Sequence, residues 1–248
     1  MGSAPDDDRP DVSLPPRHAG TRVVMLSSEE WGVVLLSLRV GVVAMAALLP
    51  VAFALAWLLA RGRFPGKILL DALVHLPLVL PPVVTGWWLL LLFAPAGPLG
   101  MMSGHILFRW TGAAIAAAVM ALPLMVRAIR LSIEGVDRRL EDAARTLGAG
   151  RARVFRTITL PLCAPGIVAG VVLGFARALG EFGATITFVS NVPGETETLP
   201  LAIYTALQMP GGDATAWRLA AISVAISLAA LIVSEAIARR AGRGVHVL

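Results

Sequence analysis

Five long, predominantly hydrophobic stretches follow one another along the chain, separated by polar or charged connections. They cover residues 33–60, 69–93, 112–129, 164–189 and 217–238. Each is long enough to cross the hydrocarbon core of a bilayer, which takes about 20 apolar residues as a helix. A further apolar stretch, residues 199–209, is too short to cross and is expected to be an interfacial or re-entrant helix. The pattern predicts an all-α integral membrane protein with about five transmembrane helices.

The segment before the first hydrophobic stretch, residues 1–32, is polar and punctuated by prolines, so we expect a flexible tail there. No short apolar segment with a small-residue cleavage site follows Met1, which argues against a removable signal peptide. We therefore expect the first stretch to remain as a membrane anchor. Residues 33–248 are then predicted to form one transmembrane domain.

The composition strengthens the membrane assignment. Hydrophobic residues make up 57% of the chain, charged residues only 15%, and the mean hydropathy is +0.78. Ordinary soluble domains contain about 45–50% apolar residues. The chain is basic, with a net charge of +5, but its arginines lie at the ends of the apolar stretches. That placement is typical of membrane topology, so we do not expect nucleic-acid binding.

Lysine and arginine concentrate in alternate connections. The connection after the first stretch, the long connection after the third and the C-terminus are all basic, whereas residues 190–216 contain no Lys or Arg. Cytoplasmic connections carry the excess of positive charge. The distribution therefore places the N-terminal tail outside the cytoplasmic membrane, and the long basic connection and the C-terminus in the cytoplasm.

The sequence contains no residue pattern typical of an enzyme or a metal site. Cys163 is the only cysteine, the four histidines are scattered, and neither a His-x-x-x-His nor a Gly-x-Ser-x-Gly pattern occurs. Gly66-Lys67 lacks the flanking residues of a phosphate-binding loop. We therefore expect no catalytic residue and no metal or cofactor bound by this chain.

Prolines interrupt the second hydrophobic stretch at Pro77 and at the pair Pro81 and Pro82, with Thr85 a turn further on. Proline removes a backbone donor and clashes with the preceding turn, so this helix must kink or unwind. One interpretation is a kink that neighbouring helices relieve. The other is that freed backbone groups and Thr85 line a passage for a polar solute.

The fourth stretch carries small residues every fourth position, which lets another helix approach closely. This stripe consists of Gly166, Gly170 and Gly174, and it continues through Arg177, Glu181 and Thr185. Ionised side chains are costly in a bilayer and usually face the bundle interior or water. Arg177 and Glu181 are therefore expected either to form a local ion pair that serves packing or to lie at a gate near a translocation path.

Residues 134–161 form a basic, helix-forming segment between the third and fourth stretches. Helical spacing predicts a short amphipathic helix that begins near Asp137 and carries an apolar stripe of Val136, Leu140, Ala143, Ala144 and Leu147. Gly148 follows, where a left-handed C-cap suits glycine. A second short helix follows and ends at Pro161. We expect these two helices and the glycine corner to form one docking surface outside the membrane.

The motif in this segment resembles the EAA loop of ABC importer permeases. The order Asp142-Ala143-Ala144, three residues, Gly148, nine residues and Ile-Thr-Leu-Pro matches the spacing of the signature Glu-Ala-Ala, x3, Gly, x9, Ile-x-Leu-Pro. Asp142 replaces the usual Glu, and Glu141 precedes it, so either carboxylate can contact the ATPase. The resemblance implies an ATPase-coupling loop over residues 131–161 that uses Glu141, Asp142, Ala143, Ala144, Gly148, Ile158, Leu160 and Pro161.

A longer stretch, residues 175–200, resembles the molybdate-type branch of oxyanion importer permeases. The Arg-Ala-Leu-Gly-Glu-Phe-Gly of residues 177–183 is shared with sulfate permeases, whereas the Ser-Asn-Val-Pro-Gly-Glu-Thr of residues 190–196 is similar to molybdate permeases. The resemblance implies a type I ABC importer permease fold and a subunit that moves molybdate across the cytoplasmic membrane.

The same resemblance implies the partners. They are a second copy of the chain, two cytoplasmic ATPase subunits that hold ATP and Mg, and an extracytoplasmic molybdate-binding protein. A sulfate, thiosulfate or tungstate permease is the alternative within the family. A passive anion channel is the alternative outside it. The residues expected at the translocation path or gate are Pro81, Pro82, Thr85, Arg177, Glu181 and Thr185.

Overall fold

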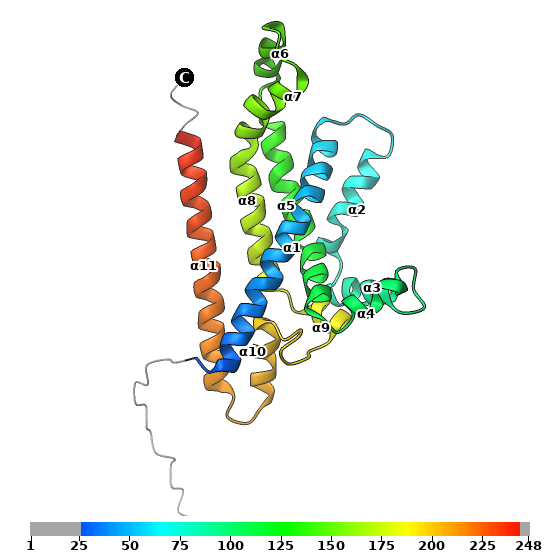
Figure 1. Ribbon diagram of the computed structural model, residues 1–248, viewed down its shortest axis with the longest axis vertical. Coiled ribbons are helices and arrows are strands. Elements are labelled where there is room, and N and C mark those ends of the chain that lie inside the picture. Colours follow the sequence, from blue (N-terminus) through cyan, green and yellow to red (C-terminus); the bar gives the residue numbers. More distant parts are fainter. Residues whose placement is uncertain (1–25, 244–248) are drawn as a thin grey trace, which may run out of the picture.

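The computed structural model describes residues 26–243, and helices are the only regular elements in that part of the chain. The long helices are α1 (Ser28–Arg61), α5 (Trp110–Glu134), α8 (Leu160–Leu179) and α11 (Asp213–Arg243). At the centre α1, α5 and α8 pack side by side, while α11 lies against α8 (Figure 1). The all-α prediction is confirmed.

Four helices are long and apolar enough to cross a membrane, with α8 counted from Arg151. A fifth span results if α2 (Lys67–Val79) and α3 (Pro82–Phe93) are counted together, although the chain bends by 113° between them. This agrees with the expected number of about five. The helix α5 extends beyond the predicted bounds 112–129 mainly at its C-terminal end, and α11 extends beyond 217–238 at both ends.

The first helix begins earlier than predicted. Ser27 accepts a hydrogen bond from the backbone N–H of Glu30, and the Glu30 carboxylate accepts one from the backbone N–H of Ser27. This capping box fixes the helix start at Ser28. Residues 28–32, which we assigned to the tail, are therefore helical. Residues 1–25 of the predicted tail lie outside the part of the chain that the structure describes.

The second hydrophobic stretch breaks at the prolines, as expected. Pro77 is accommodated within α2, but Leu80 and Pro81 are extended and Pro82 starts α3, where its missing N–H has no intrahelical partner to lose. The chain then passes through two short turns, η1 (Gly100–Met102) and α4 (Ser103–Ile106), before α5. In Figure 1, α3 and α4 project sideways from the bundle.

The fourth hydrophobic stretch is not one helix over residues 164–189. The helix α8 ends at Leu179, Gly180 occupies its C-cap, and α9 (Gly183–Val189) starts separately. Tertiary packing explains the break between α8 and α9. The helix α9 packs against α3, and it could not do so if α8 continued straight through these residues. The apolar segment after it forms α10 (Leu199–Gln208), which packs on α11.

The glycine stripe of α8 lies on the faces that meet α5 and α1. A Cβ on Gly170 would lie 3.2 Å from the backbone oxygen of Met125 in α5, and one on Gly174 would lie 2.8 Å from Sδ of Met45 in α1. A Cβ on Gly166 would overlap the side chain of Ser132. The stripe therefore allows close helix packing within this subunit, as its spacing indicates.

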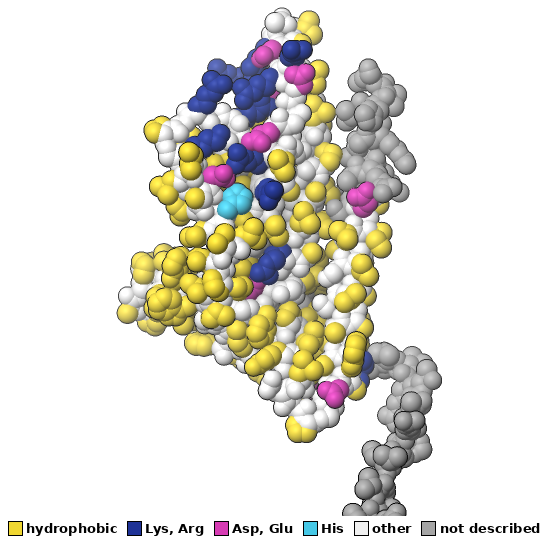
Figure 2. All heavy atoms as spheres, turned by 180° about the vertical axis from the view of Figure 1, so that it is seen from behind, with side chains coloured by type: hydrophobic (Ala, Val, Ile, Leu, Met, Phe, Trp, Pro, Cys, Tyr) yellow, Lys and Arg dark blue, Asp and Glu magenta, His cyan; other side chains and the backbone are white. Residues whose placement is uncertain are grey.

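Charge is distributed unevenly along the bundle. Figure 2 shows Lys, Arg, Asp and Glu side chains gathered at the end that carries α6, while hydrophobic side chains cover most of the remaining face. Exposed hydrophobic residues on α2, α3 and α11 reach 87% exposure at Ile68 and 77% at Trp217. A surface of this kind is stable in lipid rather than in water.

Candidate functional site

The predicted docking segment protrudes from one end of the bundle as an elbow, residues 135–159. It contains α6 (Arg138–Thr146), α7 (Arg151–Val154) and a π-helical turn, η2 (Phe155–Thr159). Asp137 caps α6 by accepting a hydrogen bond from the backbone N–H of Arg139 at 2.9 Å. The amphipathic helix therefore starts where the sequence predicted it.

The corner of the elbow is a Schellman motif. Gly148 has φ +84°, its N–H donates to the carbonyl of Arg145, and the N–H of Ala149 donates to that of Ala144. These bonds satisfy carbonyls that the end of α6 leaves open, and the positive φ suits glycine. A Cβ on Gly148 would meet nothing within 4 Å, so the corner itself is open to the surroundings.

The second arm of the elbow differs from the prediction of a short helix that ends at Pro161. It runs without interruption through η2 into α8, and Pro161 lies in the first turn of α8. The backbone N–H of Leu160 bonds to the carbonyl of Phe155, five residues earlier. This wide turn directly precedes Pro161, whose ring would clash with the previous turn of a regular α-helix.

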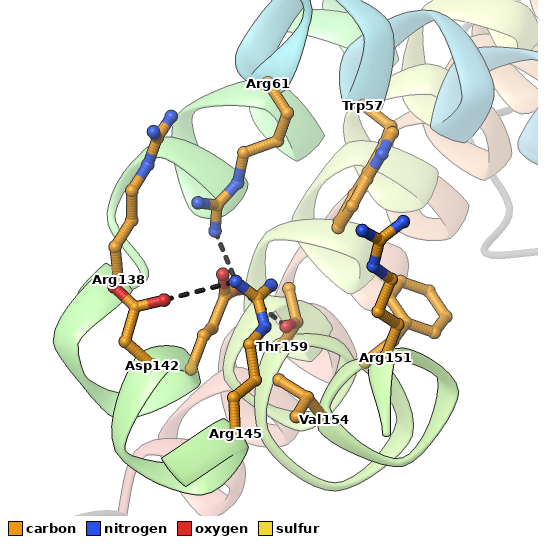
Figure 3. A pocket seen from close by; sticks show the side chains of 10 residues that line it. Trp57, Arg61, Arg138, Asp142, Arg145, Arg151, Val154 and Thr159 are labelled. Atoms are coloured by element: carbon orange, nitrogen blue, oxygen red, sulfur yellow. Dashed lines mark hydrogen bonds and ion pairs between the residues drawn. The ribbon is translucent and has the colours of Figure 1, made fainter. Parts of the chain in front are cut away.

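The two neighbouring carboxylates of α6 point in different directions. Glu141 is buried, and its Oε1 accepts hydrogen bonds from Nη2 of Arg61 at 2.9 Å and from the hydroxyl of Thr159 at 2.7 Å. Asp142 is exposed, and among the described residues it forms an ion pair only within α6, with Arg145 at 3.1 Å. Figure 3 shows Arg61 and Thr159 converging from α1 and η2, with the Asp142 pair beside them.

The apolar stripe of α6 lies mostly on the outside. Val136 is buried, but Leu140 is 51% exposed and Leu147 is 88% exposed. Ala143 is also exposed, whereas Ala144 is partly covered. The helix therefore turns its buried carboxylate towards the bundle and leaves its leucines open. Among the remaining motif residues, Leu160 and Pro161 are exposed and Ile158 is half-buried.

A cleft of about 400 Å³ opens between the elbow and the end of α1 (Figure 3). Its charged lining residues are Arg61, Arg138, Glu141, Asp142, Arg145 and Arg151. Four arginines face two carboxylates there, so the cleft is electropositive. Within residues 26–243, Arg138 and Arg151 make no ion pair. This arrangement can attract acidic groups of a partner.

The residues predicted for the path or gate gather at the far end of the bundle, around the packed helices α3 and α9. Arg177 pairs with Glu181 at 2.6 Å, and Glu181, which is 2% exposed, also accepts a hydrogen bond from the backbone N–H of Ala184. The local ion pair is present, and Glu181 caps α9. Its predicted role as a gate stays a prediction.

Two threonines accompany that pair. Thr185 on α9 and Thr85 on α3 are both buried, and the hydroxyl of Thr85 has no hydrogen-bond partner within residues 26–243. Gly86 lets the two helices touch, since a Cβ there would lie 2.9 Å from Cα of Ala184. Thr85 also borders a cavity of about 320 Å³ in the bend between α2 and α3, whose other lining residues are apolar.

Three residues that join the elbow to the end of α1 were not singled out from the sequence for this role. Arg61 was read as part of a basic connection that lacks a phosphate-binding loop, Thr159 as a variable position of the EAA motif, and Trp57 was not considered. No local pattern pairs residues 80 positions apart, so Arg61 could not be found this way. The capping residues Ser27 and Glu30 were also missed, although Ser-x-x-Glu before an apolar run is a readable signal.

No group of three or more His, Cys, Asp or Glu that could hold a metal ion occurs among residues 26–243. Cys163 is a buried free cysteine. The elbow therefore offers hydrogen-bonding and electrostatic contacts and an open apolar tip. Such a surface is suited to binding another protein.

Comparison with known proteins identifies the class. Residues 49–243 match the family described as the inner membrane component of binding-protein-dependent transport systems. The chain belongs to this family and is an inner-membrane permease subunit. In fold, it resembles the crystal structure of a bacterial ABC transporter that imports the acidic polysaccharide alginate. The TM-score is 0.68 at 18% identity, over 87% of this chain and 80% of that one.

The particular relatives include two transport permeases. The chain is 57% identical to the molybdenum transport system permease protein ModB of Escherichia coli K12, over 89% of this chain and all of that protein. It is 39% identical to the sulfate transport system permease protein CysT of Salmonella typhimurium, over 77% of this chain and 70% of that protein. The predictions of an ABC importer permease and of a non-catalytic subunit are confirmed.

Proposed function

We propose that this protein is the membrane-spanning permease subunit of an ATP-driven importer of molybdate. The higher identity to the molybdenum permease than to the sulfate permease supports the choice of oxyanion. The chain would bind no cofactor itself, and ATP and Mg would be held by partner ATPase subunits. The single observation that supports the energy coupling is the elbow, whose Leu140 and Leu147 are 51% and 88% exposed.

The elbow is proposed to dock on the ATPase through the outer face of α6. Leu140, Ala143 and Leu147 would enter an apolar recess of the partner, and Asp142 rather than Glu141 would make the polar contact. The exposure of Asp142 supports this assignment, because the buried Glu141 is already engaged with Arg61. Hydrophobic anchors surrounded by charged residues are typical of protein interfaces.

The proposed assembly follows from the family. Two copies of this chain would form the passage, each with one ATPase at its elbow, and an extracytoplasmic binding protein would deliver molybdate. The elbow end, which carries the positive charge, would lie in the cytoplasm, and the start of α1 would lie outside. ATP binding would draw the two elbows together and tilt the helix bundles, which switches access from one side to the other.

The path at the outer end is proposed to involve the bent helices. The prolines Pro81 and Pro82 place α3 against α9, and Thr85, Thr185 and the ion pair of Glu181 lie at this junction. Rearrangement of α3 against α9 would then open or close the passage. Weak contacts would suit transport, since tight binding on the path slows release.

Uptake in reconstituted vesicles tests the proposal. The chain is purified with its co-purifying ATPase and binding protein, and labelled molybdate uptake is measured with and without ATP. We expect ATP-dependent uptake that unlabelled molybdate competes. Stronger competition by sulfate, thiosulfate or tungstate would reassign the substrate. Uptake without ATP or partners would indicate a passive channel and overturn the proposal.

A further inference from the structure

The helix α6 is joined to the rest of the subunit by surprisingly few polar contacts. Within residues 26–243, the side-chain hydrogen bonds and ion pairs that connect α6 with another element all end on Glu141. The other side-chain bonds of this helix, such as those of Asp142 and Thr146, stay within it. Besides the covalent chain and its packing on α7 and η2, α6 is therefore held by the polar contacts of one carboxylate.

The partners of Glu141 come from two different elements. Thr159 belongs to the π-helical turn that leads into α8, whereas Arg61 is the last residue of α1, 80 positions earlier in the chain. The side chains of Glu141 and Arg61 are 9% and 15% exposed. At this burial their attraction is only weakly screened by water and salt.

Aromatic contacts bring the same two elements together. Trp57, one turn before Arg61, meets Phe155 of the π-helical turn edge to face, with ring centroids 5.3 Å apart. Phe53 meets the same ring at 6.1 Å. The guanidinium of Arg61 also lies 5.8 Å from the Trp57 ring. The end of α1 is therefore held against η2 by packing, and it reaches α6 through Arg61.

We infer that Arg61 and Glu141 couple the elbow to α1, so that α1 moves with α6 when the ATPase pulls on the elbow. The pair deepens the proposed function and rests on it. The covalent chain connects α6 to α5 and α8, and α1 packs against both of these helices. Within residues 26–243, the pair of Arg61 and Glu141 is the only side-chain hydrogen bond or ion pair that joins α6 directly to α1. Arg61 and Glu141 are thus positioning residues that join the elbow directly to α1, in addition to the indirect connection through α5 and α8.

A purely structural role makes a different prediction. If the pair only helps the elbow to fold, its loss lowers the stability and the amount of complex, but each ATP hydrolysed by the remaining complex still moves the same amount of molybdate. If the pair transmits movement, complexes assemble and hydrolyse ATP, but hydrolysis is less productive. The ratio of molybdate uptake to ATP hydrolysis separates the two.

The test uses the complete complex in vesicles and compares wild type with Arg61→Gln and Glu141→Gln. We expect each variant to keep its ATPase subunits and to lose about fivefold or more in uptake per ATP, the lower end of typical coupling between sites. Arg61→Lys, which keeps the charge, is expected to lose about twofold at most. The reversed pair Arg61→Glu with Glu141→Arg should restore most of the ratio.

The matched control is Glu30→Gln at the other end of α1. Glu30 is as buried as Glu141 and is also bound by one arginine, Arg218, at 2.7 Å. Its loss should cost stability and leave uptake per ATP unchanged. Should Arg61→Gln or Glu141→Gln fail to assemble, Thr159→Val removes one contact to Glu141 and should lower the ratio in the same direction.

An unchanged ratio in Arg61→Gln and Glu141→Gln would overturn the inference, as would failure of the reversed pair to restore it. In the case of failed assembly, an unchanged ratio in Thr159→Val would do so. These outcomes leave the proposed function intact, because wild type then still shows ATP-driven uptake. If wild-type complexes show no ATP-dependent uptake of molybdate, the proposed function itself is wrong.

Discussion

The two ends of the bundle both contain a buried ion pair, but they differ in how closely the surrounding segments pack. Each end has a buried glutamate bound by an arginine, Glu141 with Arg61 at the elbow and Glu30 with Arg218 at the start of α1. At the elbow the glycine corner is open and the leucines are exposed. At the other end the short helices α3 and α9 pack so closely that Gly86 touches backbone. The elbow, which we call the open end, exposes a surface that can bind a partner. The opposite end, with α3, α9 and the start of α1, packs against itself, and we call it the closed end.

The largest effect on stability is expected where the closed end is tightest. Gly86→Ala places a methyl group against the backbone of Ala184, and overpacking of this kind costs about 3 kcal/mol. Thermal unfolding of the purified protein in detergent measures the loss. The matched control is Gly32→Ala on α1, where nothing lies within 4 Å. Equal melting temperatures for the two variants would contradict the close packing of α3 on α9.

The buried ion pair at the closed end comes next. Glu30→Gln removes the charge that holds Arg218 and weakens the capping box, and we expect a loss of about 2 kcal/mol because Arg218 is partly exposed. The neighbouring Glu29 is exposed, so Glu29→Gln serves as control and should change stability by no more than about 0.5 kcal/mol. Unfolding temperatures compare the two. A Glu30 variant as stable as its control would show that this pair contributes nothing.

A smaller effect is expected at the open corner. Gly148→Ala meets no neighbouring atom but must adopt a positive φ, which costs about 1 kcal/mol. Gly148→Asn should cost less, because asparagine tolerates this conformation. Gly148→Trp should leave the subunit in the membrane and abolish ATP-driven uptake, since the bulky ring would obstruct docking. Normal uptake by the Trp variant would mean that the corner does not approach the ATPase.

The smallest effect on stability is expected at the exposed tip. Leu147→Ser should change the unfolding free energy by no more than about 0.5 kcal/mol, because Leu147 is 88% exposed. It should nevertheless reduce the amount of ATPase that co-purifies. Met101→Ser provides the control, since Met101 is 92% exposed but lies before α4, away from the elbow. Equal losses of ATPase in both variants would contradict docking at α6.

The sequence predicts the open end better than the closed end, for a physical reason. The start of α6 at Asp137 and the corner at Gly148 depend on capping and backbone preferences that act within a few residues. Hydrophobic length predicts the number of membrane-spanning helices, but not their bounds, since α1 begins at Ser28 and α8 ends at Leu179. The break at Pro81 and Pro82 was also expected, because proline acts locally.

What the sequence could not predict depends on contacts between distant segments. Gly180 was read as part of a continuous helix, because the packing of α9 on α3, which favours the break after α8, is a contact between distant segments. The apolar stripe of α6 was recognised, but not which side faces the bundle. That side is decided by Arg61, which no local pattern connects to Glu141. Only the structure shows that Glu141 is buried whereas Asp142 is exposed.

The π-helical turn between α7 and α8 has a geometric consequence for the elbow. Each residue of an α-helix advances the direction of the next side chain by about 100°. The wide turn at Phe155–Thr159 therefore sets the azimuth at which the elbow leaves the membrane helix. Deleting one residue of this turn would restore regular α-helical winding. The elbow would then rotate about the axis of α8, and its leucines would face a different direction.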